Sequence, residues 1–255
     1  MLSGLLGKKV GMTHLFGEEG RLVPVSVVEV GPCVVTQLKT DVTDHYEAVQ
    51  IGYGSVKQLN RPARGHLRKA NARDVRHLQE FRASDIAGFQ PGDILDAGQF
   101  FEGEFVHITA RSKGRGFQGA MKRHGFGGGP KTHGQKDRGR APGSIGSGTY
   151  PGRVLKGQRM PGHMGNRQVT VRGLKIVKVD RERNLILLRG AVPGARGTLV
   201  TIRHADLSLA RKALEESLLS QQAEEINQEQ VTLAETAEAI IGETTEEAAE
   251  VEEST

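Results

Sequence analysis

The residues of this sequence that could do chemistry are cations concentrated in one central segment. Between Arg111 and Gln168 there are 13 Lys or Arg, 16 Gly, four Pro and one acidic residue, Asp137. Ammonium and guanidinium groups neutralise phosphates, and glycines between them let backbone amides approach an anion closely. Thirteen cations against one carboxylate leave a net charge of +12, which needs a partner of opposite sign. The segment is therefore predicted to bind a polyanion that surrounds it, and folded RNA fits best.

The candidate RNA-contacting side chains are of several chemical kinds. Lys and Arg are expected to meet phosphates, and Arg can also stack on bases. Histidines are expected to hydrogen bond to phosphate or base, with stacking as a second option and polar filler as the alternative. Aromatic rings are expected to stack on unpaired bases. The predicted contacts are Lys113, Arg115, Lys122, Arg123, His124, Lys131, His133, Lys136, Arg138, Arg140, Ser144, Tyr150, Arg153, Lys156, Arg159 and Arg167, with Phe117 and Phe126 as further stacking rings.

Other site chemistries fit this segment poorly. Gly114 to Gly119 matches the G-x-G-x-x-G fingerprint of dinucleotide sites, which needs a helix after it and a parallel sheet around it. Gly125 and the glycines at 127–129 leave room for barely a turn or two of helix. Ser144 lacks the preceding glycine of a nucleophile elbow, and the histidines lack the Cys or paired carboxylates of a metal site. We therefore expect no catalysis, no cofactor, no metal and no small-molecule substrate.

The length and composition of the chain limit the class of protein to which it can belong. The chain of 255 residues suggests one or two domains. It contains no run of 18 apolar residues, so no membrane span is expected, and Met1 to Lys9 lacks the pattern of a signal peptide. Its one cysteine, Cys33, excludes an internal disulfide and is predicted to be a buried thiol. These features favour a cytoplasmic protein, or one in an equivalent reducing compartment.

The elements that position the cationic segment are predicted to be short β-strands. Turn signals at Gly31-Pro32, Gln90 to Asp93 and Pro193-Gly194 separate runs rich in Val, Ile and Leu. Because strands stand on both sides of it, the segment 111–168 is inserted in a β domain with both ends pinned, and a small closed barrel is expected. The expected strands lie near residues 23–27, 34–35, 48–53, 105–110, 169–171, 185–188 and 199–202.

The segment 111–168 itself is predicted to be an extended Gly/Arg/Lys-rich loop. No stretch in it alternates or repeats so as to form a helix or strand with an apolar face. Doubled back, each arm has about 29 residues and spans at most roughly 95 Å. The loop can therefore reach far beyond a barrel of small-domain size.

A second basic stretch, residues 53–92, is predicted to be an insert with short helices. Asn71 is a candidate N-cap for a helix in which Val75, Leu78 and Phe81 recur at three-residue spacing, ending near Gly88. The insert is either a solvated layer packed on the barrel or a second phosphate-contacting surface. Both roles are compatible.

The end of the chain is acidic. Residues 213–255 hold 13 acidic residues and no Lys or Arg, whereas residues 1–212 carry +18. The expected organisation is a β-barrel body over 1–212, including the 53–92 insert and the 111–168 loop, and an acidic tail over 213–255. Helical spacing extends from Leu207 to Leu218, and the tail beyond it is expected to be helical or disordered.

Five motifs give the chain a family resemblance. They are Gly-Leu-Leu-Gly-Lys-Lys-Val-Gly-Met-Thr-His-Leu-Phe at 4–16, Gly-Arg-Gly-Phe-Gln-Gly-Ala-Met-Lys-Arg-His-Gly-Phe at 114–126, Arg-Ala-Pro-Gly-Ser-Ile-Gly at 140–146, Met-Pro-Gly-His-Met-Gly-Asn at 160–166 and Gly-Ala-Val-Pro-Gly at 190–194. Residues 1–204 resemble the bacterial large ribosomal subunit protein three family. The resemblance implies a barrel like those of translation factors, and a primary binder of large-subunit ribosomal RNA that helps start assembly in the cytoplasmic ribosome. It also implies that a tip near Ser144 to Gly152 approaches the peptidyl transferase centre, and that neighbouring ribosomal proteins pack on the globular part.

Two departures from that family pattern stand out. Many bacterial members carry a methylated glutamine near the tip, but residues 147–150 contain none, so that modification is not expected. The acidic extension is not explained by the resemblance. The alternatives are a general RNA-binding chaperone, which would bind any RNA with little preference, and a dinucleotide-binding enzyme acting through Gly114 to Gly119.

Overall fold

The computed structural model describes residues 2–17, 20–72, 75–83 and 85–205. The acidic tail over 213–255 and the helical spacing over 207–218 lie outside the described residues. Among these residues, short turns, three small helices and one long loop connect the strands. The elements are β1 (Gly4–Phe16), β2 (Leu22–Val30), β3 (Cys33–Lys39), α1 (Asp41–Asp44), β4 (Ala48–Ser55), α2 (Arg61–Arg68), β5 (Val75–Phe81), β6 (Ile94–Leu95), the 3₁₀ turn η1 (Ala97–Gln99), β7 (Phe105–Arg111), β8 (Phe117–Gln118), α3 (Ala120–His124), β9 (Gly162–His163), β10 (Gln168–Asp180), β11 (Leu185–Arg189) and β12 (Leu199–His204).

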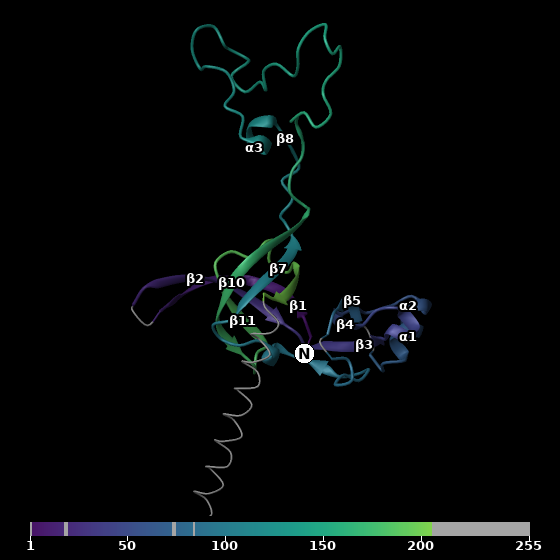
Figure 1. The fold of residues 1–255 in the computed structure, drawn as a ribbon. Helices are drawn as coiled ribbons and strands as arrows, with labels where there is room; N and C mark the ends of the chain where they lie inside the picture. Colours follow the sequence, from purple (N-terminus) through teal and green to yellow (C-terminus); the bar gives the residue numbers. More distant parts are fainter. Residues whose placement is uncertain (1, 18–19, 73–74, 84, 206–255) are drawn as a thin grey trace, which may run out of the picture.

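Six strands form the body of the molecule. They pair in the order β1-β12-β7-β10-β11-β2, and β2 pairs back with β1, so the antiparallel ladder closes as a barrel (Figure 1). The fully buried side chains of Leu5, Ile108, Ile176, Ile186 and Ile202 belong to one hydrophobic core. The prediction of a mainly-β protein is confirmed, and every predicted strand lies within an observed one.

A four-stranded antiparallel sheet packs beside the barrel in the order β5-β4-β3-β6. Its strands begin at Cys33, so residues 53–92 fold together with two strands that precede them. Val35, Ile51 and Phe81 of this sheet share the core cluster with the barrel residues. The turn predicted at Gln90 to Asp93 is confirmed, since the Asp93 amide donates to the Gln90 carbonyl at 3.1 Å.

The helix predicted after Asn71 is wrong. Val75–Phe81 is strand β5, which pairs with β4 from Val49↔Phe81 to Ser55↔Val75. Three-residue spacing places Leu78 on the opposite face of a strand from Val75 and Phe81, and Leu78 is accordingly exposed while they are buried. The helix of this region is α2 instead, which begins after Asn60, whose side chain accepts from the Ala63 amide at 3.1 Å.

The cationic segment leaves the barrel from two neighbouring strands, β7 and β10, and projects from it as a long doubled loop (Figure 1). The expectation that it contains no helix or strand is wrong at residues 117–124 and 162–163. There β8 pairs with β9, and α3 follows β8 directly, some distance out from the barrel (Figure 1). We call residues 111–118 and 162–168 the neck, and residues 125–159 the distal loop.

Candidate nucleic-acid interface

The neck is held by main-chain hydrogen bonds between its two arms. Ser112 donates to Arg167 at 2.9 Å and Asn166 donates back to Ser112 at 3.1 Å. Arg115 donates to Met164 at 2.9 Å, and Met164 donates to Gly116 at the same distance. With the β8–β9 pair these bonds continue the barrel ladder outward. The neck therefore fixes the direction in which the distal loop leaves the body.

Close approach of the two arms depends on a glycine. Gly165 has φ +74°, and a Cβ at this position would overlap the carbonyl oxygen of Lys113 and lie 3.2 Å from Gly114 Cα. Only glycine combines a positive φ with this absence of a side chain at little cost. The neighbouring Asn166 also has a positive φ of 50°, which asparagine tolerates better than most residues. The Met-Pro-Gly-His-Met-Gly-Asn motif thus has a local structural cause at its last two positions.

The root of the neck is braced by a buried lysine that the sequence analysis did not single out. Lys9 donates from Nζ to the carbonyl of Val192 at 2.6 Å and to that of Gly194 at 3.3 Å. Burial, and secondarily the charge of Lys113, lower the pKa of Lys9. Gly194 packs so closely that a Cβ there would lie 3.0 Å from the Arg111 carbonyl oxygen. Nothing in the local pattern Lys8-Lys9 distinguishes the buried ammonium from the exposed one.

Helix α3 ties the outgoing arm to the returning one above the neck. Arg123 donates from a guanidinium nitrogen to the Met160 carbonyl at 2.8 Å, and His124 Nε2 lies 3.1 Å from the same oxygen. His124 is also 6.0 Å from Phe126, ring centre to ring centre. Two of the predicted RNA contacts therefore have partners inside the protein.

The distal loop folds back on itself at a turn. Gly129 donates to the Gly139 carbonyl at 3.2 Å, and Ala141 donates to the Arg138 carbonyl at 3.1 Å. An open hollow of about 500 Å³ lies at this turn and is lined mainly by glycines, Phe126, Gln135 and Arg138.

The predicted contact residues are spread along the whole loop. Lys113, Arg115 and Arg167 lie in the neck, Lys122, Arg123 and His124 in α3, and the rest in the distal loop. All are exposed except His124, which is half-buried. Tyr150 is 89% exposed and Phe117 is 68% exposed, the latter resting edge-on against His163 at 5.8 Å. Exposed rings interleaved with cations are the combination that binds single-stranded nucleic acid.

The loop cations are not paired with carboxylates of the part of the chain that the structure describes. Among the described residues, no ion pair involves a Lys or Arg of the segment 111–168. Their fields therefore add along the projection and fall off over about 10 Å at ordinary ionic strength. The arrangement can neutralise a folded polyanion but supplies no paired acid and base for catalysis.

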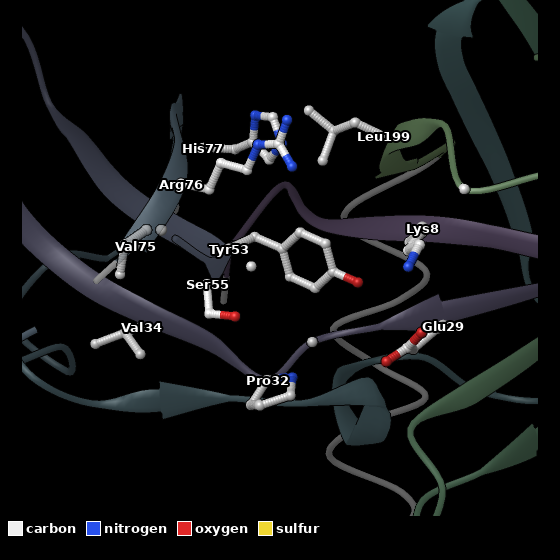
Figure 2. Close-up of a pocket in the computed structure, with 14 residues that line it drawn as sticks. Lys8, Glu29, Pro32, Val34, Tyr53, Ser55, Val75, Arg76, His77 and Leu199 are labelled. Atoms are coloured by element: carbon white, nitrogen blue, oxygen red, sulfur yellow. The ribbon is translucent and has the colours of Figure 1, made fainter. Parts of the chain in front are cut away.

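A separate pocket lies between the barrel and the second sheet (Figure 2). It has about 550 Å³, and Figure 2 shows the Tyr53 hydroxyl directed toward Lys8 and Glu29. Burial and the charge of Glu29 raise the pKa of Tyr53 to about 12. Burial and the charge of Arg76 lower the pKa of His77, another residue that lines this pocket.

The fold around Gly114 to Gly119 does not fit a dinucleotide-binding site. Gly114 to Gly119 lies in the neck, between antiparallel strands, and the helix after it has five residues. A pyrophosphate site of that class needs a parallel sheet and a longer helix. Within the described ranges, no group of three or more His, Cys, Asp or Glu is placed to hold a metal ion. The same ranges contain no helix long and apolar enough to cross a membrane.

Comparison with known proteins gives a consistent answer. A family model described as Ribosomal protein L3 matches residues 89–184, which include the whole loop. Large ribosomal subunit protein uL3 of Roseiflexus sp. (strain RS-1) is 58% identical over 207 residues, which are 80% of this chain and 98% of the relative. The uL3 of Acaryochloris marina is 52% identical over 81% of this chain and 98% of the relative, and that of Corynebacterium efficiens is 47% identical over 80% and 94%.

These alignments cover nearly the full length of each relative, and this chain has residues beyond them. Identity of this level over about 200 residues is incompatible with chance similarity of a basic loop. The barrel, the doubled cationic loop and the alignments lead to one assignment. The chain belongs to the uL3 family of large ribosomal subunit proteins.

Proposed function

We propose that this protein is a structural, non-enzymatic component of the large ribosomal subunit that binds ribosomal RNA chiefly through the loop 111–168. The observation that carries the proposal is the loop itself. Its 13 cations are borne on a hydrogen-bonded neck that projects from the barrel, and no described carboxylate neutralises them. The protein works in the cytoplasm, as part of the ribosome.

Binding is driven by phosphate neutralisation and the release of counterions. Lys113, Arg115 and Arg167 meet phosphates along the neck, and the cations of the distal loop meet those farther out. Tyr150 stacks on an unpaired base, and the Ser144 hydroxyl hydrogen bonds to RNA. The neck fixes the orientation of the loop, so RNA that closes around the loop is held in a defined orientation relative to the barrel.

Helix α2 offers a second contact surface beside the four-stranded sheet (Figure 1). Arg61, Arg64 and Arg68 recur at helical spacing and are all exposed. Only Leu67 of this helix is buried, against Ala70, Ala72 and Val75. A helix anchored by one apolar residue and otherwise cationic suits a phosphate backbone.

The family resemblance supports three finer proposals. The protein is a primary RNA binder that helps to start subunit assembly, its tip near Ser144 to Gly152 approaches the peptidyl transferase centre, and neighbouring ribosomal proteins contact its globular part. The closed antiparallel pairing of six strands also supports a barrel of the translation-factor kind. A crosslink from the tip to RNA of the peptidyl transferase centre tests the placement, and reconstitution of the subunit without this chain tests the assembly role.

Salt dependence tests the loop as the main RNA contact. If roughly six loop cations meet phosphates, affinity for a cognate ribosomal RNA fragment falls by about 10³ or more between 50 and 200 mM salt. Replacement of Arg138 and Arg140 by Ala flattens the slope of log affinity against log salt by about 1.5. The matched control is Arg181→Ala with Arg183→Ala, at the turn between β10 and β11, which leaves the slope unchanged. An unchanged slope in the loop variant would place the contacts elsewhere.

The same measurement distinguishes a ribosomal protein from a general RNA-binding chaperone. An unrelated folded RNA of equal length is titrated at each salt concentration. The ribosomal protein keeps a preference for its cognate fragment at 200 mM salt, whereas a chaperone binds both RNAs alike.

A further inference from the structure

The pocket between the barrel and the second sheet is formed by both parts of the body (Figure 2). Strands β1, β2 and β12 line its barrel side, and β3, β4 and β5 line its sheet side. Its volume of about 550 Å³ lies within the range of about 300–1,000 Å³ that is typical of small-ligand sites. Its residues belong neither to the loop 111–168 nor to helix α2, so the RNA contacts proposed above leave it unassigned.

The Tyr53 hydroxyl is a polar group without a protein partner at this pocket. Tyr53 is 8% exposed, and Figure 2 shows its hydroxyl directed toward Lys8 and Glu29. Within the part of the chain that the structure describes, no group forms a hydrogen bond with this hydroxyl. Buried tyrosine hydroxyls usually have a hydrogen-bond partner, and a phenol at neutral pH is protonated and can donate. An acceptor that enters the pocket would satisfy it.

Charged side chains around the pocket are likewise unpaired among the described residues. Lys8 and Glu29 are cross-strand neighbours in the β1–β2 ladder, yet no ion pair joins them. No carboxylate in the described ranges forms an ion pair with Arg76 of β5. Lys8 and Arg76 are exposed, and Glu29 is half-buried. The pocket thus combines a phenol donor, a carboxylate acceptor and two exposed cations.

This combination distinguishes between classes of ligand. A phosphate alone would meet the two cations but would be repelled by the carboxylate of Glu29. An apolar ligand would cover the phenol and the carboxylate without giving either a hydrogen bond. A nucleobase carries donors and acceptors side by side on its Watson–Crick edge, and its strand brings phosphates to the cations. Because that edge is occupied in a duplex, the nucleotide that fits must be unpaired.

We propose that this pocket binds one unpaired nucleotide of ribosomal RNA that is turned out of its strand. Glu29 accepts a hydrogen bond from the base, the Tyr53 hydroxyl donates one to it, and Lys8 and Arg76 neutralise the adjoining phosphates. The inference rests on the proposed function, because it takes the ligand from ribosomal RNA. It adds selection for an RNA structure, which phosphate contacts alone do not provide.

Removal of a single hydroxyl tests the base contact. Wild-type protein and Tyr53→Phe are titrated with the cognate ribosomal RNA fragment at 200 mM salt. The matched control is Tyr46→Phe, whose hydroxyl donates to Glu80 at 2.9 Å and lies outside this pocket. We expect about fivefold weaker binding by Tyr53→Phe and no change in the control. Urea titrations should show no loss of stability in Tyr53→Phe, because its hydroxyl has no described protein partner to lose.

The sign of a change at Glu29 distinguishes a base contact from a bystander. If the carboxylate only repels nearby phosphates, Glu29→Gln strengthens RNA binding. If it accepts from a base, the same change exchanges a charge-assisted hydrogen bond for a weaker neutral one, and binding weakens. We expect the weakening. Tighter binding by Glu29→Gln, or equal affinity of wild type and Tyr53→Phe, would overturn the proposal.

Salt dependence separates the base contact from the phosphate contacts of the same site. Lys8→Ala combined with Arg76→Ala should flatten the slope of log affinity against log salt by about 1.5, since two phosphate contacts are lost. Tyr53→Phe should lower the affinity without a change of slope. A double variant with the wild-type slope would overturn the assignment of the two cations.

A crosslinker at the pocket identifies the occupant in assembled particles. Full-length protein carrying p-benzoylphenylalanine in place of Ser55, an exposed residue that lines the pocket, is assembled into large subunits and irradiated. A second preparation carries the probe in place of Tyr150 at the loop. We expect the Ser55 probe to crosslink to one ribosomal RNA position, mapped as a stop to reverse transcription.

The outcomes separate this inference from the proposed function. A Ser55 probe that crosslinks only to protein, or to nothing, overturns the nucleotide site, while an RNA crosslink from Tyr150 leaves the proposed function intact. Absence of the protein from purified subunits overturns both.

Discussion

Lys9 and Cys33 are both buried in the described part of the body, and each is accommodated differently. The Lys9 ammonium is met by two carbonyl oxygens, which offsets the cost of burying its charge. Cys33 is fully buried as a neutral thiol that donates to the Leu6 carbonyl at 3.4 Å. Burial raises the pKa of Cys33 to about 11. The prediction of a buried core thiol from its apolar neighbours is therefore confirmed.

The thiol makes stability depend on pH above its ordinary pKa of 9.0. Below that pH the thiol is protonated in both the folded and the unfolded chain, so its burial contributes its full share to the free energy of unfolding. As pH rises toward 11, the unfolded thiol ionises and the folded one does not, which lowers the free energy of unfolding by about 2 kcal/mol. We expect urea titrations to show the stability gap between wild type and Cys33→Ala narrowing by this amount between pH 8.5 and 11. A gap that stays constant would mean that the thiolate is not excluded from the fold.

At the scale of elements, the neck joins the arms of the loop to the barrel, and Gly165 permits their contact. Replacing it by Ala forces a Cβ against the Lys113 carbonyl at a φ that disfavours side chains, at a cost of about 1–3 kcal/mol. We expect trypsin to cut the free wild-type protein in the distal loop while the neck and barrel resist. In Gly165→Ala, cleavage after Lys113 and Arg115 is about tenfold faster.

The control for this experiment is Gly146→Ala. An added Cβ there has open space around it, and the residue does not have a positive φ. Its cleavage pattern should match that of the wild type. Identical patterns for all three proteins would show that Gly165 does not hold the arms together. Protection of the distal loop in purified large subunits would show that RNA encloses it.

Seven strands could be predicted from the sequence because each contains a short apolar run near a turn signal. It failed where pairing is non-local. The seven residues of β5 fit either a helix or a strand, and their ladder with β4 decides the outcome. The neck was missed because its strands have two residues each and no apolar alternation. Lys9 was missed because its partners are more than 180 residues away in the chain. The candidate cations, by contrast, could be identified from the composition of the segment and the spacing of its Lys and Arg residues alone.

At the scale of the whole molecule, one body presents cationic surfaces in two directions. The cationic loop projects from the barrel, whereas the basic helix α2 packs on the neighbouring sheet (Figure 1). Such separation lets RNA bind to both surfaces without competition for the same residues.

The acidic tail is the one large countercharge in the sequence. Its 13 carboxylates could screen the loop of an unassembled protein from indiscriminate RNA, which is a hypothesis drawn from charge alone. We expect truncation after Lys212 to increase binding to unrelated RNA at low salt and to leave binding to cognate ribosomal RNA intact. A tail of equal length with Gln in place of every Glu is the matched control and should behave like the truncation. Equal binding of unrelated RNA by full-length and truncated proteins would reject the hypothesis.

The paired neck also constrains how the loop can change length during evolution. A single insertion in one arm shifts the register against the other, and a one-residue slip turns the following side chains to the opposite face. The main-chain bonds from Ser112 to Gly116 would then lose their partners at 164–167. Residues such as Gly146 and Gly148 in the distal loop have open space around them and impose no such matching. Related sequences should therefore gain or lose single residues freely in the distal loop, but alter the neck only by balanced changes in both arms.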